Sequence, residues 1–136
     1  MIAVGIDVSK SKSTIAIINS DGQLLAKPKN YNHTSNDLKS LIDLINVYQK
    51  DVKVAMEATG HYHYPILKAL LNENIYVSLI NPYIMKKYGD SNICKSKTDK
   101  KDAIRIAFYV IEKSYQLSPY TVVNQKYDDL KFLSRQ

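Results

Sequence analysis

The chain has 136 residues, 45% of them hydrophobic and 24% charged, which suffices for one domain with a buried core and argues against disorder. No apolar run approaches the roughly 20 residues of a membrane span, and the first residues lack a signal-peptide pattern. The single cysteine, Cys94, excludes an internal disulfide and disfavours a zinc site. We therefore expect a cytoplasmic protein. The net charge of +6 favours polyanionic partners.

The first predicted elements are strands. Apolar residues alternate with small ones over positions 2–8, and Asp7 is the acid on the small-residue face. A second strand is predicted over residues 13–19 and a third over residues 23–27, with the turn sequence Asp21-Gly22 between them. This pattern is typical of an antiparallel meander.

Helices and strands alternate in the middle of the chain. Residues 34–36 offer helix caps, and the apolar residues that follow recur at helical spacing until Tyr48. The next predicted elements are a strand over residues 52–58, a helix over residues 66–71 and a strand over residues 75–80. Glu57 lies near the end of the first of these strands, and Asn81-Pro82 closes the second.

The segment from Tyr83 to Thr98 is irregular and rich in lysine, so no regular element is predicted there. Thr98 is expected to cap a last helix. Its predicted apolar face consists of Ile104, Ala107, Phe108 and Ile111. We expect a domain over residues 1–115, followed over residues 116–136 by the start of a connecting, amphipathic helical segment.

The predicted order is βββαβαβα, which indicates an α/β fold with a mixed sheet and helices on both faces. This is the order of ribonuclease H-like folds. Because one fold serves many activities, the function has to be inferred from the side chains.

Acidic residues are the strongest functional signal. In a ribonuclease H-like sheet the strands that carry Asp7 and Glu57 are neighbours, so the two carboxylates can converge. Asp99 and Asp102 lie one turn apart on the last predicted helix and present their carboxylates on one face. Four such acids repel one another and are stable mainly when hard divalent cations neutralise them. Two cations about 4 Å apart promote phosphodiester displacement.

Each acid also has a simpler interpretation as an exposed surface carboxylate. Asp7 fits it least, since an acid within an apolar strand is costly to bury without a partner. His61 and His63 have no further Cys or His partners nearby, so we do not expect them to bind metal.

Several motifs resemble a known family. GIDVSK at residues 5–10, EATGHYHYP at 57–65, INP at 80–82 and KTDKKDAIRIA at 97–107 resemble, in order and spacing, the N-terminal RuvC-like domain of the DEDD transposases of insertion sequences. The resemblance covers nearly the whole chain. It implies that the family's four acids correspond to Asp7, Glu57, Asp99 and Asp102, which would bind Mg²⁺ or Mn²⁺, with two ions expected.

The resemblance also implies partners. The family's members recombine DNA, are guided by a structured RNA, and need a C-terminal domain that supplies a nucleophilic serine. We therefore expect a homo-oligomeric full-length protein, a dimer or tetramer, that acts at the nucleoid of a prokaryotic cell and not at a membrane. The expected nucleic-acid contacts are Lys10, Lys12, Tyr62, Lys86, Lys87, Lys95, Lys97, Lys100, Lys101 and Arg105.

Two alternatives remain open. GIDVSKSKSTIAIIN also resembles the first phosphate-binding hairpin of actin-like sugar kinases, but that hypothesis leaves KTDKKDA unexplained. The chain could instead be a non-catalytic module that binds nucleic acid or supports assembly, with vestigial acids. Metal titration distinguishes this alternative from a catalytic domain.

Overall fold

A five-stranded mixed sheet runs through the centre of the molecule. The computed structural model describes residues 1–48, 51–58, 60, 62–90 and 99–120, and the side chains of residues 89–90 and 99–101 lie outside that description. The strands are β1 (Ile2–Val8), β2 (Lys12–Asn19), β3 (Leu24–Asn32), β4 (Val52–Glu57) and β5 (Val77–Ile80). Their spatial order is β3-β2-β1-β4-β5. The first three strands pair antiparallel, and β4 lies parallel to both β1 and β5. The predicted mixed sheet is confirmed.

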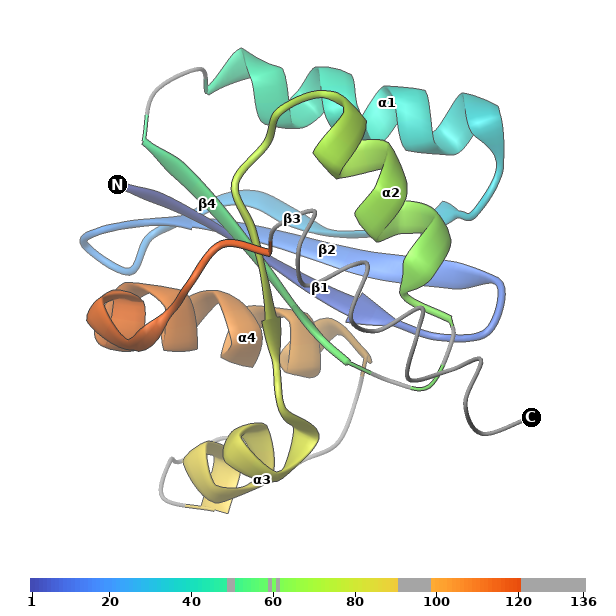
Figure 1. Ribbon diagram of the computed structural model, residues 1–136. Coiled ribbons are helices and arrows are strands. Elements are labelled where there is room, and N and C mark those ends of the chain that lie inside the picture. The colour runs from blue at the N-terminus through green and yellow to red at the C-terminus, as the bar shows by residue number, and fades with distance from the viewer. Residues whose placement is uncertain (49–50, 59, 61, 91–98, 121–136) are drawn as a thin grey trace.

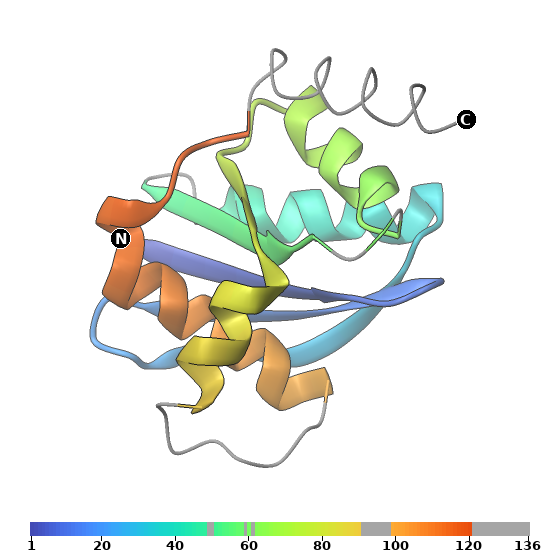
Figure 2. The ribbon, with the colours of Figure 1, turned by 60° about the horizontal axis from the view of Figure 1, so that its bottom comes forward.

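Helices cover both faces of this sheet, as predicted (Figures 1 and 2). The helices are α1 (Ser35–Val47), α2 (Tyr64–Asn72), α3 (Pro82–Asp90) and α4 (Asp99–Lys113), followed by the 3-10 turn η1 (Ser114–Gln116). α1 and α2 lie on one side of the sheet, and α3 and α4 lie on the other. Thr34 caps α1, because its hydroxyl accepts a hydrogen bond from the backbone N–H of Asp37 at 3.3 Å. No helix within the described residues is long and apolar enough to cross a membrane.

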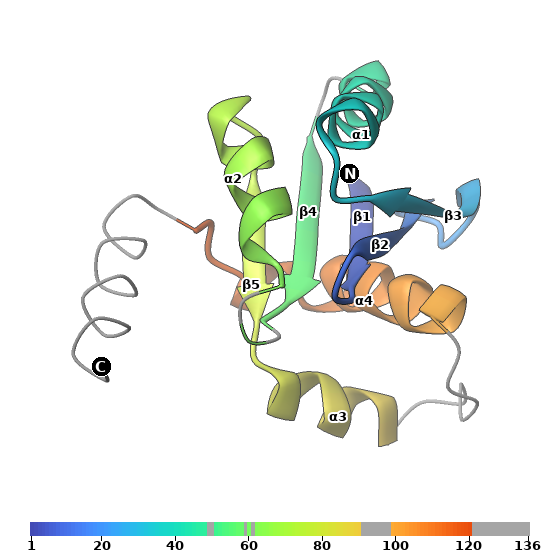
Figure 3. The same ribbon diagram turned by 90° about the vertical axis from the view of Figure 1, so that its right-hand side faces the viewer.

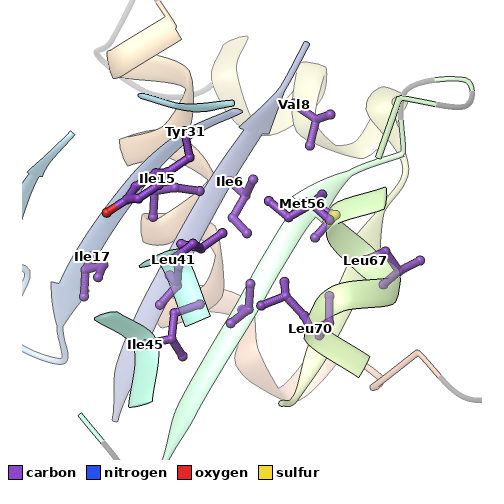
Figure 4. Packing of buried hydrophobic residues seen from close by; sticks show 14 of the residues in the cluster. Ile6, Val8, Ile15, Ile17, Tyr31, Leu41, Ile45, Met56, Leu67 and Leu70 are labelled. Atoms are coloured by element: carbon purple, nitrogen blue, oxygen red, sulfur yellow. The ribbon is translucent and has the colours of Figure 1, made fainter. Parts of the chain in front are cut away.

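The alternation of side chains along the strands produces two hydrophobic cores. On the side of α1 and α2, the first core includes Ile6, Ile15, Leu41, Met56 and Leu70, which meet between the sheet and the helices (Figure 4). The second core lies on the other face. Its main residues are Ala3, Ile18, Ala55, Ile80, Met85, Tyr88, Ile106, Ala107, Tyr109 and Val110. The small residues predicted on the second face of β1 are therefore the surface on which α4 packs.

Gly5 is the position at which α4 approaches the sheet most closely. A Cβ atom there would lie 2.5 Å from the backbone nitrogen of Ala107 and closer still to the carbonyl oxygen of Ala103. Only glycine leaves room for the helix backbone at this point. The glycine of the GIDVSK motif thus sets how deeply α4 is seated against β1.

The segment after Asn81 corrects the prediction of irregular structure, because residues Pro82–Asp90 form α3. The Oδ1 atom of Asn81 accepts a hydrogen bond from the backbone N–H of Tyr83 at 2.8 Å, and Pro82 occupies the first helical turn. The pair that seemed to close a strand therefore also starts a helix. Among the α3 side chains that are described, those of residues 82–88, Met85 and Tyr88 are the buried ones, which is too few to give a clear helical pattern in the sequence.

Two further predictions differ from the structure. β3 extends to Asn32, beyond the predicted end at residue 27. On α4 the fully buried residues are Ala103, Ile106, Ala107, Tyr109 and Val110. Of the four residues predicted to form the apolar face, only Ala107 is among them, and Ile104, Phe108 and Ile111 are half-buried. Because α4 lies so close to Gly5, only small side chains fit at the centre of the contact. The periodicity of apolar residues does not distinguish such small residues from larger ones.

The chain after α4 returns to the edge of the sheet. The backbone N–H of Tyr120 donates to the carbonyl oxygen of Val77 at 2.7 Å, and the Ser78 hydroxyl donates to the carbonyl oxygen of Ser118 at 2.8 Å. Tyr120 also belongs to the first core. The packed part of the chain thus reaches residue 120. The predicted helix further along, like the predicted cap at Thr98, lies outside the described residues.

Candidate active site

Two of the predicted acids lie at the carboxyl ends of neighbouring parallel strands. The last aligned pair between β1 and β4 is Ile6 with Met56, so Asp7 and Glu57 are the next residues along the two strands. Gly5 and Ala55 face α4, and side chains alternate along a strand. Asp7 and Glu57 therefore lie on the α4 face as well, and both are half-buried.

Helix α4 supplies the third acid. Asp102 precedes Ala103, whose carbonyl lies over Gly5, and it stands one turn before the buried Ile106. Glu57 and Asp102 thereby line the same cavity of about 280 Å³. The remaining lining residues are Pro82, Met85, Lys86, Arg105 and Ile106, so α3 and α4 form its walls. In Figure 3, α3 extends from the lower end of β5 and runs below α4.

Two acids, Glu57 and Asp102, and two bases, Lys86 and Arg105, line this cavity. Burial raises the pKa of Glu57, the negative charge of Asp102 raises it further, and Arg105 lowers it. Arg105 Nη1 lies 3.5 Å from Asp102 Oδ1, and the Arg105 side chain is only 17% exposed. The guanidinium thus partly offsets the repulsion between the two carboxylates.

The fourth predicted acid, Asp99, is the first residue of α4, one turn before Asp102. Its side chain lies outside the described part of the chain. Among the side chains that are described, no group of three or more His, Cys, Asp or Glu residues is arranged to hold a metal ion. Glu57 and Asp102 nonetheless fit a divalent cation by their chemistry, because hard cations prefer carboxylate oxygens and two repelling carboxylates gain from a shared positive charge.

The predicted nucleic-acid contacts fall into three groups. Those on the surface are Lys10, Lys12, Tyr62, Lys86 and Lys87. Those whose side chains lie outside the described part of the chain are Lys95, Lys97, Lys100 and Lys101. Arg105 stands apart, because it is mostly buried beside Asp102. Of the six predicted contacts whose side chains are described, Lys86 and Arg105 line the cavity.

The two histidines of the loop after β4 play different parts. His61 lies outside the described residues. His63 precedes α2, is 3% exposed, and has its ring centroid 4.4 Å from that of Tyr64. It is a packed residue at the start of a helix.

A polar row beside Asp7 was not predicted. Asp7 is aligned with Thr14 on β2, and Thr14 is aligned with Asn30 on β3. The Thr14 hydroxyl donates to Asn30 Oδ1 at 2.7 Å, although Thr14 itself is only 2% exposed. Polar side chains therefore continue from Asp7 across two more strands. In the sequence, the sign of this row is one threonine within an apolar strand, and threonine is common in strands of every kind.

Comparison with known proteins adds a family and a fold. Residues 4–136 match the family model DEDD_Tnp_IS110, described as a transposase. The chain is 29% identical over 106 residues to a transposase for insertion sequence element IS1533 from Leptospira borgpetersenii, an alignment that covers 78% of this chain and 30% of that protein. The chain therefore spans about a third of this relative's length.

Two solved structures share the fold. One is described as the Thermus thermophilus RuvC structure, with a TM-score of 0.65 and 14% identity, covering 88% of this chain and 100% of that one. The other is T. thermophilus RuvC in complex with a Holliday junction substrate, with a TM-score of 0.60 and 13% identity, covering 88% of this chain and 99% of that one. The fold is thus RuvC-like, as predicted.

Proposed function

This chain belongs to the IS110 family of DEDD transposases, and on that premise we propose that it cleaves and exchanges DNA strands during transposition, with divalent metal bound by Asp7, Glu57, Asp99 and Asp102. The observation that carries the proposal is the convergence of Glu57 and Asp102, from β4 and α4, on one cavity that Lys86 and Arg105 also line. Carboxylates for a cation and bases for a phosphate are what a phosphodiester site requires.

Each side chain has a role in this proposal. The carboxylates bind Mg²⁺ or Mn²⁺, two ions when all four acids take part, and the exposed Lys86 attracts the phosphate backbone. Arg105 holds Asp102 in place and moderates the charge of the acids. When bound, the cations would activate an attacking oxygen and stabilise the leaving one. The actin-like kinase alternative loses support, since the family match runs through the KTDKKDA block.

The whole protein would do more than this chain. The chain spans 30% of the length of its Leptospira relative. We therefore propose that a C-terminal domain supplies a nucleophilic serine, and that the catalytic domain predicted over residues 1–115 extends to Tyr120, which packs in the first core. In this proposal the connecting helical segment follows Tyr120. The proposed full-length protein is guided by a structured RNA and assembles as a dimer or tetramer. It acts at the nucleoid in the cytoplasm. This chain alone should bind metal and nucleic acid without completing strand exchange.

Calorimetric titration with Mn²⁺ tests the proposed site. We expect the Asp102→Asn and Asp7→Asn variants to bind Mn²⁺ at least about tenfold more weakly than the wild type, because affinity for hard cations follows the number of ligand charges. Asp43→Asn is the matched control, since Asp43 is an exposed acid on α1, across the sheet from the cavity.

Equal Mn²⁺ affinity in the wild type and all three variants would contradict the proposal and favour a non-catalytic binding module. Cleavage of a branched DNA substrate provides the second measurement. Metal-dependent nicking by the full-length wild-type protein, which carries the proposed serine, is the expected result, with the activity lost in Asp102→Asn and retained in Asp43→Asn.

A further inference from the structure

Helix α3 is firmly attached to the body of the domain along one side. Met85 is 5% exposed and Tyr88 is 9% exposed, and both belong to the second core. The Tyr88 hydroxyl donates to Glu112 Oε2 at 2.8 Å, and its ring meets that of Tyr109 edge-on at a centroid distance of 5.2 Å. These contacts join α3 to α4, so side chains on the outer side of α3 have a defined position relative to the cavity.

The outer side of α3 carries an exposed aromatic ring. Tyr83 is 64% exposed, and Lys87, one turn further along, places its Nζ atom 4.8 Å from the centre of the Tyr83 ring. The backbone of Tyr83 is held by the Asn81 cap. The fold gains little from this side chain, because most of its surface remains in water. A solvent-facing tyrosine beside a lysine, on a helix that is anchored to the domain, is instead suited to stacking on a planar group attached to an anion.

Tyr83 lies on the same helix as three residues of the candidate active site. Pro82, Met85 and Lys86 line the cavity together with Glu57 and Asp102. Residues three apart on a helix are neighbours on its surface, about 5–6 Å between Cβ atoms, so Lys86 connects the cavity to Tyr83.

We propose that Tyr83 and Lys87 form a stacking surface for an unpaired DNA base next to the phosphate that occupies the cavity. The inference rests on the proposed function, because it takes the cavity as the place of the reacting phosphate. Lys86 and Lys87 provide the complementary charge for the backbone, and the Tyr83 ring provides a face that any base can use. The site thus selects a DNA strand that is locally unpaired.

Equilibrium binding without metal tests this surface. Fluorescence anisotropy with a labelled oligothymidylate and with a duplex of the same length, both in EDTA, compares the wild type with Tyr83→Ala, Tyr83→Trp and Tyr115→Ala. Tyr115 is the matched control, since it is a 75% exposed tyrosine on η1, about 20 Å along α4 from Asp102. Near-ultraviolet circular dichroism verifies that each variant is folded.

We expect Tyr83→Ala to weaken oligothymidylate binding by about 10-fold, within the range of one lost base stack, and to change duplex binding by less than about twofold. Tyr83→Trp should retain the wild-type affinity, and Tyr115→Ala should resemble the wild type. The inference is overturned by equal single-strand affinity of Tyr83→Ala and the wild type, or by equal losses for single strand and duplex. Because metal is absent, this failure is separate from failure of the Mn²⁺ titration.

Discussion

Replacing Gly5 with alanine tests how the candidate site is assembled. The added Cβ would lie 2.5 Å from Ala107 N and 3.1 Å from Ala107 Cα, whereas ordinary contact begins at 3.4 Å. Helix α4 must then move away from β1 by about 0.9 Å or more, because the obstructing atoms belong to the helix backbone and cannot rotate aside. The displacement acts directly on Asp102, which is the neighbour of Ala103.

The expected magnitude follows from overpacking. Inserting a methyl group into a well-packed core costs about 1–3 kcal/mol, and alanine recovers about 0.5–1 kcal/mol because it restricts the unfolded chain more than glycine does. We therefore expect Gly5→Ala to lower the free energy of unfolding by about 1–2 kcal/mol. Mn²⁺ affinity should fall as well, since the carboxylates on β4 and α4 no longer converge at the same distance.

Urea unfolding followed by circular dichroism, together with the Mn²⁺ titration, measures both effects. Gly22→Ala is the comparison, since Gly22 has a φ of +82° in the turn before β3, and a Cβ there would be 3.4 Å from the Phe108 ring. It should lose about 1 kcal/mol through backbone strain and keep its Mn²⁺ affinity. Adding Ala107→Gly to Gly5→Ala should not restore stability, because the clash involves backbone atoms. Wild-type stability and Mn²⁺ affinity in Gly5→Ala would refute the proposed seating of α4.

Two other predictions concern the charge at the site and the extent of the domain. The pKa of Glu57 is raised above its reference value of 4.5, so the folded state binds this proton more tightly than the unfolded state does. Ionisation of Glu57 therefore destabilises the fold, and the loss of stability grows as the pH rises from 4.5 through the pKa of the folded state. In EDTA, Glu57→Gln should therefore be more stable than the wild type at neutral pH and equal to it below pH 4.5, and lower stability of the variant at neutral pH would contradict this. Tyr120→Ala should lose about 3 kcal/mol in urea unfolding, because Tyr120 is 9% exposed in the first core, and a loss below 1 kcal/mol would show that the domain ends before it.

Local patterns in the sequence were sufficient for most of the secondary structure. The alternation in β1, the turn at Asp21-Gly22, the Thr34 cap and the apolar spacing of α1 each depend on neighbouring residues in the chain. The periods of two and 3.6 residues report which side of an element is buried. Together with the order of the elements, they indicated the mixed, RuvC-like sheet that the structure contains.

The sequence analysis predicted no helix at α3, and three of the four residues it expected on the buried face of α4 are only half-buried; both errors have a physical reason. Lysines and exposed apolar residues dilute the pattern of α3, and its two buried residues, Met85 and Tyr88, acquire their role only through contact with α4. On α4 the small Ala103 and Ala107 form the centre of the contact because the glycine beneath them admits the helix backbone. Such complementarity involves residues about a hundred positions apart in the sequence.

By itself, the sequence determined which acids are candidates, since Asp7 interrupts an apolar strand and the motifs around Glu57, Asp99 and Asp102 resemble those of DEDD transposases. Only the tertiary structure decided that Glu57 and Asp102 line one cavity, that Arg105 lies beside Asp102 within it, and that Tyr83 is exposed on the helix that forms one of its walls. A residue's chemistry belongs to its side chain. Its partners depend on how β1, β4, α3 and α4 pack, and that packing is set by long-range contacts.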